Sequence, residues 1–126
     1  MTPEAKVKAK IHAQLKTAGA YAVNYIGGQY ATSGAPDILA CLQGRFIAIE
    51  AKAGKGRPTA LQLRALRLID TAGGLALIIN ETNLATLEEA LHDPRRAQSN
   101  YQLFERKEKD AAPEGAAEAQ LAKRVP

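Results

Sequence analysis

Two apolar runs separated by the dipeptide Gln43-Gly44 constrain the fold more than any other feature of the sequence. Residues 36–42 and 45–52 are rich in aliphatic side chains, and Gly44 can supply the positive φ that a two-residue turn needs. The runs therefore predict a β-hairpin. Because both runs are apolar on both faces, we expect the hairpin to lie in the middle of a sheet that helices cover.

A two-residue turn also determines which residues face each other across the hairpin. The numbers of facing residues then add up to 87, so Asp37 faces Glu50. Facing Cβ atoms lie roughly 5 Å apart, and two like charges at that distance among apolar residues are destabilising unless a cation compensates them. Lys52 follows Glu50 by two residues and therefore lies on the same face of the strand. The spacing predicts a cluster of two carboxylates and one ammonium.

A carboxylate pair of this kind suits Mg²⁺ or Mn²⁺, which prefer oxygen ligands and bind phosphate oxygens. In phosphodiester hydrolysis such a metal polarises the phosphoryl oxygen and activates a water, while a nearby lysine stabilises negative charge in the transition state. An ordinary explanation makes Asp37 a turn former and Glu50 a surface acid. Their match across an apolar hairpin disfavours it.

The rest of the chain predicts alternating helices and strands. The remaining expected elements are a helix over 3–18, a strand over 21–26, a helix after Thr59 with Leu61, Ala65 and Leu68 on its apolar stripe, a strand over 75–79 and a helix over 84–92. A helix between two strands implies a crossover, so strands 45–52 and 75–79 should be parallel. The fold class is α/β, with a small central mixed β-sheet flanked by helices in the order αβββαβα. Cys41 is expected to be a small core residue.

The composition changes after residue 93. Residues 1–93 contain all the predicted elements, whereas residues 94–126 have few large apolar side chains and many alternating charges. The second segment predicts a charged, largely flexible tail. Within it, residues 101–104 are able to dock on the domain or on a second subunit. We expect deletion of residues 95–126 to leave a folded core.

Charge is distributed unevenly along the chain. The first 67 residues hold ten Lys and Arg against three acids, so this half is a candidate surface for a polyanion. A single cysteine excludes a disulfide framework, and the chain has neither a membrane-spanning run nor a secretory signal, so a cytoplasmic location is expected. The segment GKGRPT falls short of a phosphate-binding loop, which argues against a nucleotide cofactor.

Further residues produce a family resemblance over roughly residues 4–92. The segments 33–37 (SGAPD), 44–46 (GRF), 50–52 (EAK) and 56–59 (GRPT), with Gln62 four residues before Leu66, resemble the VRR-NUC family of the PD-(D/E)XK nuclease superfamily. The resemblance implies a restriction-endonuclease-like fold and metal-dependent DNA cleavage in a bacterial or phage-infected cytoplasm. Small phage and bacterial members resemble Holliday junction resolvases and tend to be homodimers. A preference for branched or junction DNA and a homodimer are therefore expected.

The resemblance also implies roles for single residues. Asp37 and Glu50 are expected as metal ligands with the Ala51 carbonyl, Lys52 as the catalytic lysine and Gln62 as a further catalytic-site residue. Glu4 matches an acidic residue that the family carries on its first helix, and is expected as a metal ligand. Two alternatives stay open: Glu4 also suits the positive end of the helix dipole, and Gln62 also completes a capping box with Thr59.

Candidate DNA contacts lie in the basic half of the chain. They are Tyr30, Ser33, Lys55, Arg57 and Arg64, all close in sequence to the predicted site. A solvated charged face is the ordinary alternative for the basic residues. The leading hypothesis is an Mg²⁺- or Mn²⁺-dependent endodeoxyribonuclease. The alternative is a DNA-binding or assembly module that keeps the nuclease fold and needs a partner for cleavage.

Overall fold

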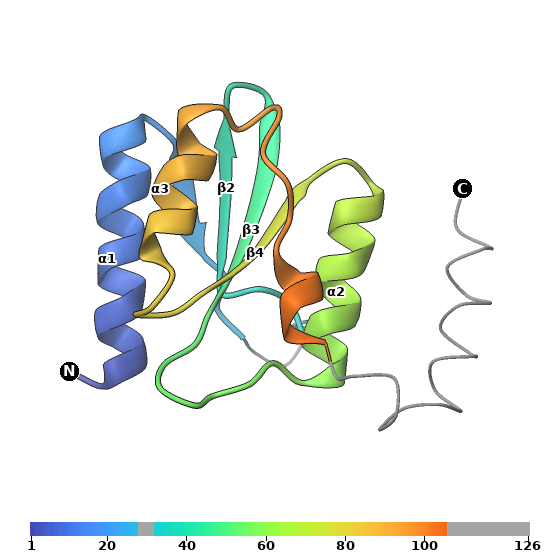
Figure 1. Ribbon diagram of the computed structural model, residues 1–126. Helices are drawn as coiled ribbons and strands as arrows, with labels where there is room; N and C mark the ends of the chain where they lie inside the picture. Colours follow the sequence, from blue (N-terminus) through green and yellow to red (C-terminus); the bar gives the residue numbers. More distant parts are fainter. Residues whose placement is uncertain (28–31, 106–126) are drawn as a thin grey trace.

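The computed structural model describes residues 1–27 and 32–105, and Figure 1 shows how their elements are layered. A four-stranded sheet forms the centre. Helices α1 (Pro3–Ala18) and α3 (Leu84–His92) cover one face, and α2 (Ala60–Thr71) packs on the other. The predicted α/β class and element order are confirmed, with a short 3-10 helix, η1 (Tyr101–Phe104), added at the end. None of the described helices has the length and hydropathy that crossing a bilayer requires.

The sheet is mixed and has the strand order β1-β2-β3-β4. Its strands are β1 (Tyr21–Asn24), β2 (Ile38–Leu42), β3 (Arg45–Ala51) and β4 (Leu75–Ile79). β2 pairs antiparallel with both β1 and β3, whereas β3 and β4 are parallel. The parallel pair follows from α2, which supplies the crossover between these two strands. The strand predicted over residues 21–26 ends two residues early.

The turn between β2 and β3 sets the register of the hairpin. Gln43 and Gly44 have φ values of 51° and 80°, so both central positions of the turn are left-handed. Ile38 then pairs with Ile49. This is the register predicted from a two-residue turn.

The main core lies between the sheet and the helices α1 and α3. Val7, Ile11 and Leu15 are buried on α1, as their helical spacing predicts. Thr2 caps this helix, because its Oγ1 accepts a hydrogen bond from a backbone N–H of the first turn at 3.1 Å. Gly19 ends it with a φ of 85°. Local signals at both ends therefore fix the position of α1.

The opposite face of the sheet is covered less fully than predicted. Leu66 of α2 is fully buried, whereas Leu61 and Leu68 of the predicted stripe are 53% and 47% exposed. The reason is that α2 packs mainly on β4 and leaves the β1 side of this face open. Cys41 of β2 is exposed on the open side, so the prediction of a core position for it is wrong. Phe46 of β3 is also partly exposed there.

The folded domain extends beyond the boundary predicted at residue 93. Residues 94–105, which we call the strap, follow α3 and lead to η1 beside α2 (Figure 1). Asn100 in the strap is buried; its Oδ1 accepts from the N–H of Ile78 at 2.7 Å, and its Nδ2 donates to the Ile78 carbonyl at 2.9 Å. The strap belongs to the domain because it supplies the hydrogen-bond partners that the edge of β4 needs. Residues 106–126, predicted to be flexible, lie outside the described residues.

Candidate active site

The predicted pair of carboxylates meets at one end of the β2–β3 hairpin. Asp37 directly precedes β2, and continuation of the strand register places it opposite Glu50. Its Oδ2 accepts a hydrogen bond from the N–H of Ala51 at 3.0 Å, so the carboxylate is turned toward β3. Its backbone carbonyl accepts from the N–H of Tyr25 at 2.8 Å. One backbone donor directly after β1 and one at the end of β3 therefore hold Asp37 in place.

Glu50 is almost completely withdrawn from water, with 2% of its surface exposed. Burial and the negative charge of Asp37 raise the pKa of Glu50 to about 8, while the positive charge of Lys52 lowers it. Its Oε1 is buried and has no hydrogen-bond partner in the part of the chain that the structure describes. A buried acid beside a second acid, with an unpaired oxygen, is costly for the fold and typical of functional sites.

Lys52 follows β3 and completes the predicted cluster. Its Nζ lies 3.5 Å from Glu50 Oε2, and 15% of its side chain is exposed. Its backbone N–H donates to the carbonyl of Ile79 at 3.0 Å, which continues the pairing of β3 with β4. Strand geometry therefore places the ammonium beside the carboxylates, as the alternation of side chains along a strand predicts.

Gln62 joins this cluster and caps α2 at the same time. Its Oε1 accepts from the N–H of Thr59 at 2.9 Å, and its backbone N–H donates to Thr59 Oγ1 at 3.1 Å. Its Nε2 donates to Glu50 Oε2 at 3.0 Å. The cap and the site role were alternatives in the sequence, and the structure combines them. This is possible because a carboxamide carries both an acceptor and a donor.

One residue at the site, Lys8, is absent from the sequence prediction. Its Nζ lies 3.7 Å from Asp37 Oδ1. The available signal is its position four residues after Glu4, on the same side of the helix. Glu4 itself does not complete an acidic triad, because no three His, Cys, Asp or Glu side chains within residues 1–27 and 32–105 form a group able to hold a metal ion. A metal-ligand role for Glu4 stays a prediction.

The free carboxylate oxygens fit a hard divalent cation. Asp37 Oδ2 and Glu50 Oε2 accept hydrogen bonds from N–H donors of the protein. Within residues 1–27 and 32–105, Glu50 Oε1 has no hydrogen-bond partner, and Asp37 Oδ1 contacts the ammonium of Lys8 at 3.7 Å. One oxygen of each acid therefore remains for a cation, and oxygen donors are the ligands that Mg²⁺ and Mn²⁺ prefer. The Ala51 carbonyl stays a predicted third ligand.

The predicted DNA contacts differ in how free their side chains are. Ser33, Lys55 and Arg64 are exposed. Arg57 is exposed as well, but its Nη2 donates to the carbonyl of Phe104 in the strap at 3.3 Å. Tyr30 lies outside the described residues. The DNA-binding roles of all five residues stay predictions.

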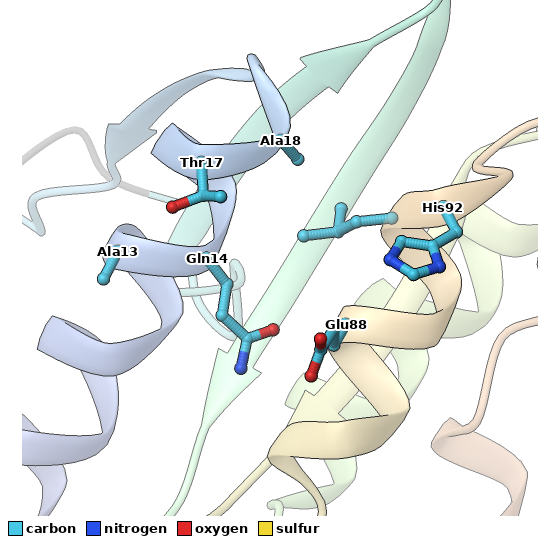
Figure 2. Close-up of a pocket in the computed structure, with 7 residues that line it drawn as sticks. Ala13, Gln14, Thr17, Ala18, Glu88 and His92 are labelled. Carbon is cyan, nitrogen blue, oxygen red and sulfur yellow. The ribbon is translucent and has the colours of Figure 1, made fainter.

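A pocket of about 530 Å³ lies away from this cluster, between the C-terminal halves of α1 and α3. Figure 2 shows Gln14 and Glu88 pointing toward each other across it, with His92 on the same helix as Glu88. Gln14 Nε2 donates to the carbonyl of Leu84 at 3.2 Å. None of the predicted site residues lines this pocket. The cluster of Asp37, Glu50 and Lys52 is therefore the stronger candidate for the active site, because it brings two acids and an ammonium together.

Comparison with known proteins gives a likeness of structure. Neither a scan against protein-family models nor a search of curated proteins finds a match. Among solved structures, the chain is similar to Hjc, a Holliday junction resolvase from the archaeal hyperthermophile Archaeoglobus fulgidus, at 22% sequence identity and a TM-score of 0.49. The similarity covers 60% of this chain and 66% of that one, so the chain spans slightly less than two thirds of that protein. Membership of the VRR-NUC family stays a prediction from the residue pattern.

Proposed function

We propose that this chain is a metal-dependent endonuclease that hydrolyses phosphodiester bonds in DNA, with Mg²⁺ or Mn²⁺ as cofactor. The observation that carries the proposal is the pairing of Asp37 with Glu50: among the described residues Glu50 Oε1 has no hydrogen-bond partner, and Asp37 Oδ1 meets the ammonium of Lys8 at 3.7 Å, beyond hydrogen-bond distance. Lys52 beside this pair adds the positive charge that favours phosphoryl transfer. The residue pattern that resembles VRR-NUC nucleases supports the same reaction.

The side chains of the site divide the work in this proposal. Asp37, Glu50 and the Ala51 carbonyl would hold the cation, which supplies Lewis acidity and an activated water when bound. Lys52 stabilises the negative charge that develops on the phosphate. Gln62 is a positioning residue, because its hydrogen bond fixes Oε2 of Glu50 and leaves Oε1 free. Burial of Glu50 strengthens these interactions, since charges attract more strongly where water is excluded.

DNA is proposed to lie along the loop after Lys52 and the exposed side of α2. Lys55 and Arg57 belong to that loop, and Arg64 follows Gln62 by two residues. Cations in these positions would contact phosphates and make binding depend on salt. Ser33, in the turn before Asp37, and Tyr30 would add backbone contacts.

The resemblance further supports branched or junction DNA as the preferred substrate and a homodimer as the active form. A two-fold dimer presents two equivalent sites, which suits a junction with equivalent strands. Sedimentation equilibrium of the full chain, with and without a four-way junction, measures the dimer independently of cleavage. A monomer under both conditions would contradict this part of the proposal.

A cleavage assay on defined substrates tests the activity. The full chain is incubated with labelled linear duplex, single strand, splayed arm and four-way junction, each with EDTA, Mg²⁺ or Mn²⁺. We expect cleavage only with the metals and fastest on branched DNA. Lys52→Met keeps the aliphatic stem and removes the charge, so it should lower the cleavage rate at least about 100-fold and leave DNA affinity within about threefold.

Two further variants make the result specific. Glu50→Gln keeps the side-chain volume and removes the metal-binding charge, so cleavage should also be lost. Arg96→Met is the matched control for the loss of one positive charge. Arg96 is 89% exposed and lies near the start of β3, where Arg45 binds the carbonyl of Ala97, whereas Glu50 lies near the other end of this strand. Undiminished cleavage by Lys52→Met and Glu50→Gln would exclude this site. Junction binding without cleavage would favour the assembly module that needs a partner.

A further inference from the structure

The ion pair between Lys8 and Asp37 has no part in the reaction proposed above. Lys8 Nζ lies 3.7 Å from Asp37 Oδ1, and the two side chains are 35% and 26% exposed. Anchoring of Asp37 does not depend on this contact, because Asp37 Oδ2 already accepts a hydrogen bond from the N–H of Ala51 at 3.0 Å. A partly exposed ion pair of this length also adds little stability. The contact therefore calls for an explanation other than folding.

Each acid of the pair has a lysine of its own. Lys52 contacts Glu50 Oε2, the oxygen that Gln62 also binds. Lys8 contacts Asp37 Oδ1, the oxygen that is left when Ala51 has bound Oδ2. Lys52 thus lies beside an oxygen that already accepts a hydrogen bond from the protein. Lys8 stands where a cation would have to bind.

We propose that Lys8 is a placeholder cation, whose ammonium neutralises Asp37 in the cation-free protein and competes with a divalent cation for Asp37 Oδ1. The inference rests on the proposed function, since it takes the acid pair as the cation site. An ammonium and a divalent cation repel each other strongly at contact distance. Lys8 is able to withdraw, because its stem is flexible and a third of the side chain is exposed. Lys52, which is 15% exposed, is held more firmly.

The inference predicts a gain of cation affinity when a residue is removed. Lys8→Met keeps the apolar stem and removes the competing charge, so the dissociation constant for Mn²⁺ should fall at least about fivefold. Lys8→Arg keeps the charge and should stay within about twofold of the wild type. If Lys8 had a merely structural role, Lys8→Met would leave Mn²⁺ binding unchanged or weaken it.

Electron paramagnetic resonance of free Mn²⁺ measures this binding on the full chain, without DNA and without turnover. The series contains wild type, Lys8→Met, Lys8→Gln, Lys8→Arg and Asp37→Asn. Lys10→Met is the matched control, because Lys10 is an exposed lysine of the same helix and its loss changes the net charge equally. We expect tighter binding in the two neutral Lys8 variants, near wild-type binding in Lys8→Arg and Lys10→Met, and loss of binding in Asp37→Asn.

The outcomes separate the two proposals. Wild-type Mn²⁺ binding that Asp37→Asn abolishes, with no gain in Lys8→Met or Lys8→Gln, would overturn the placeholder and leave the nuclease proposal standing. An equal gain in Lys10→Met would also overturn it, because net charge alone would then explain the effect. Absence of Mn²⁺ binding in the wild type and in both neutral variants would overturn both proposals. Melting curves in EDTA establish that each variant is folded.

Discussion

Gln62 Nε2 donates a hydrogen bond to Glu50 Oε2 at 3.0 Å and so joins the start of α2 to a buried acid of the central sheet. The same carboxamide closes the capping box with Thr59. One side chain therefore serves both the helix terminus and the site. Substitutions at Gln62 and Thr59 separate these two contributions.

Gln62→Ala should lower both activity and stability, whereas Thr59→Ala should lower stability alone. Gln62→Ala leaves Glu50 Oε2 with Lys52 only, so we expect cleavage to fall at least about tenfold. Thr59→Ala removes the hydroxyl acceptor of the cap, which should cost about 1 kcal/mol, and leaves cleavage within about twofold. Denaturant unfolding and initial cleavage rates measure the two effects. Equal losses of cleavage in both variants would contradict a direct role for Gln62.

Glu50 should make the cation-free protein less stable as the pH rises. Its pKa is about 8 in the folded protein and 4.5 ordinarily, so the folded state binds more protons than the unfolded state between these values. The free energy of unfolding should therefore fall from about pH 5 to pH 8, by at most about 5 kcal/mol, and level off above. Thermal melting in EDTA across this range measures the slope.

Glu50→Gln is the control for this pH dependence, because an amide does not titrate. Its melting temperature should change less between pH 5 and pH 8 than that of the wild type. Cations compete with the Glu50 proton, so Mn²⁺ affinity of the wild type should rise over the same range. A wild-type slope identical to that of Glu50→Gln would show that other groups cause the pH dependence.

Gly34 allows the loop before Asp37 to approach α2. It has a φ of +79°, and a Cβ there would lie 2.7 Å from the backbone of Leu61. Gly34→Ala should therefore cost about 2–4 kcal/mol through strain and overlap, and lower cleavage by displacing Asp37. Gly44→Ala is the control, since Gly44 has a φ of +80° with open space around it and should cost about 1–2 kcal/mol. Equal costs in urea unfolding would show that only the backbone angle matters.

The packing of the strap on β4 should depend on Asn100. Asn100→Ala leaves the N–H of Ile78 without its partner in a buried position, whereas the Ile78 carbonyl keeps the hydrogen bond from Asn83 Nδ2 at 2.9 Å, so the substitution should cost about 1–3 kcal/mol. Gln98→Ala, at an exposed position of the strap, should stay within about 0.5 kcal/mol. Urea unfolding measures both.

Shortened chains test the same contact on a larger scale. A chain that ends at residue 93 should lose cooperative melting, because it lacks Asn100 and the buried Tyr101. A chain that ends at residue 105 keeps both and should melt cooperatively. A cooperative transition in the shorter chain at the temperature of the full chain would show that the folded domain ends at residue 93.

The hairpin and the cluster of Asp37, Glu50 and Lys52 could be predicted because they follow from local rules. A two-residue turn sets the register, and the alternation of side chains along a strand sets the face. Gln62 could be predicted as a candidate, but not the sharing of its carboxamide between Thr59 and Glu50. That arrangement depends on the distance between α2 and β3, which the packing of the helix decides.

Local chemistry in the sequence thus determined the order of the elements, the caps of α1 and α2 and the pairing of the two acids, since each involves residues close together in the chain or joined by one turn. Tertiary structure alone decided which side of α2 is buried, that Asn100 binds β4, and that Lys8 reaches Asp37. The physical reason is that helix faces, strand edges and ion pairs are satisfied by whichever partner the packing brings near. Sequence periodicity describes an element by itself and does not contain that partner.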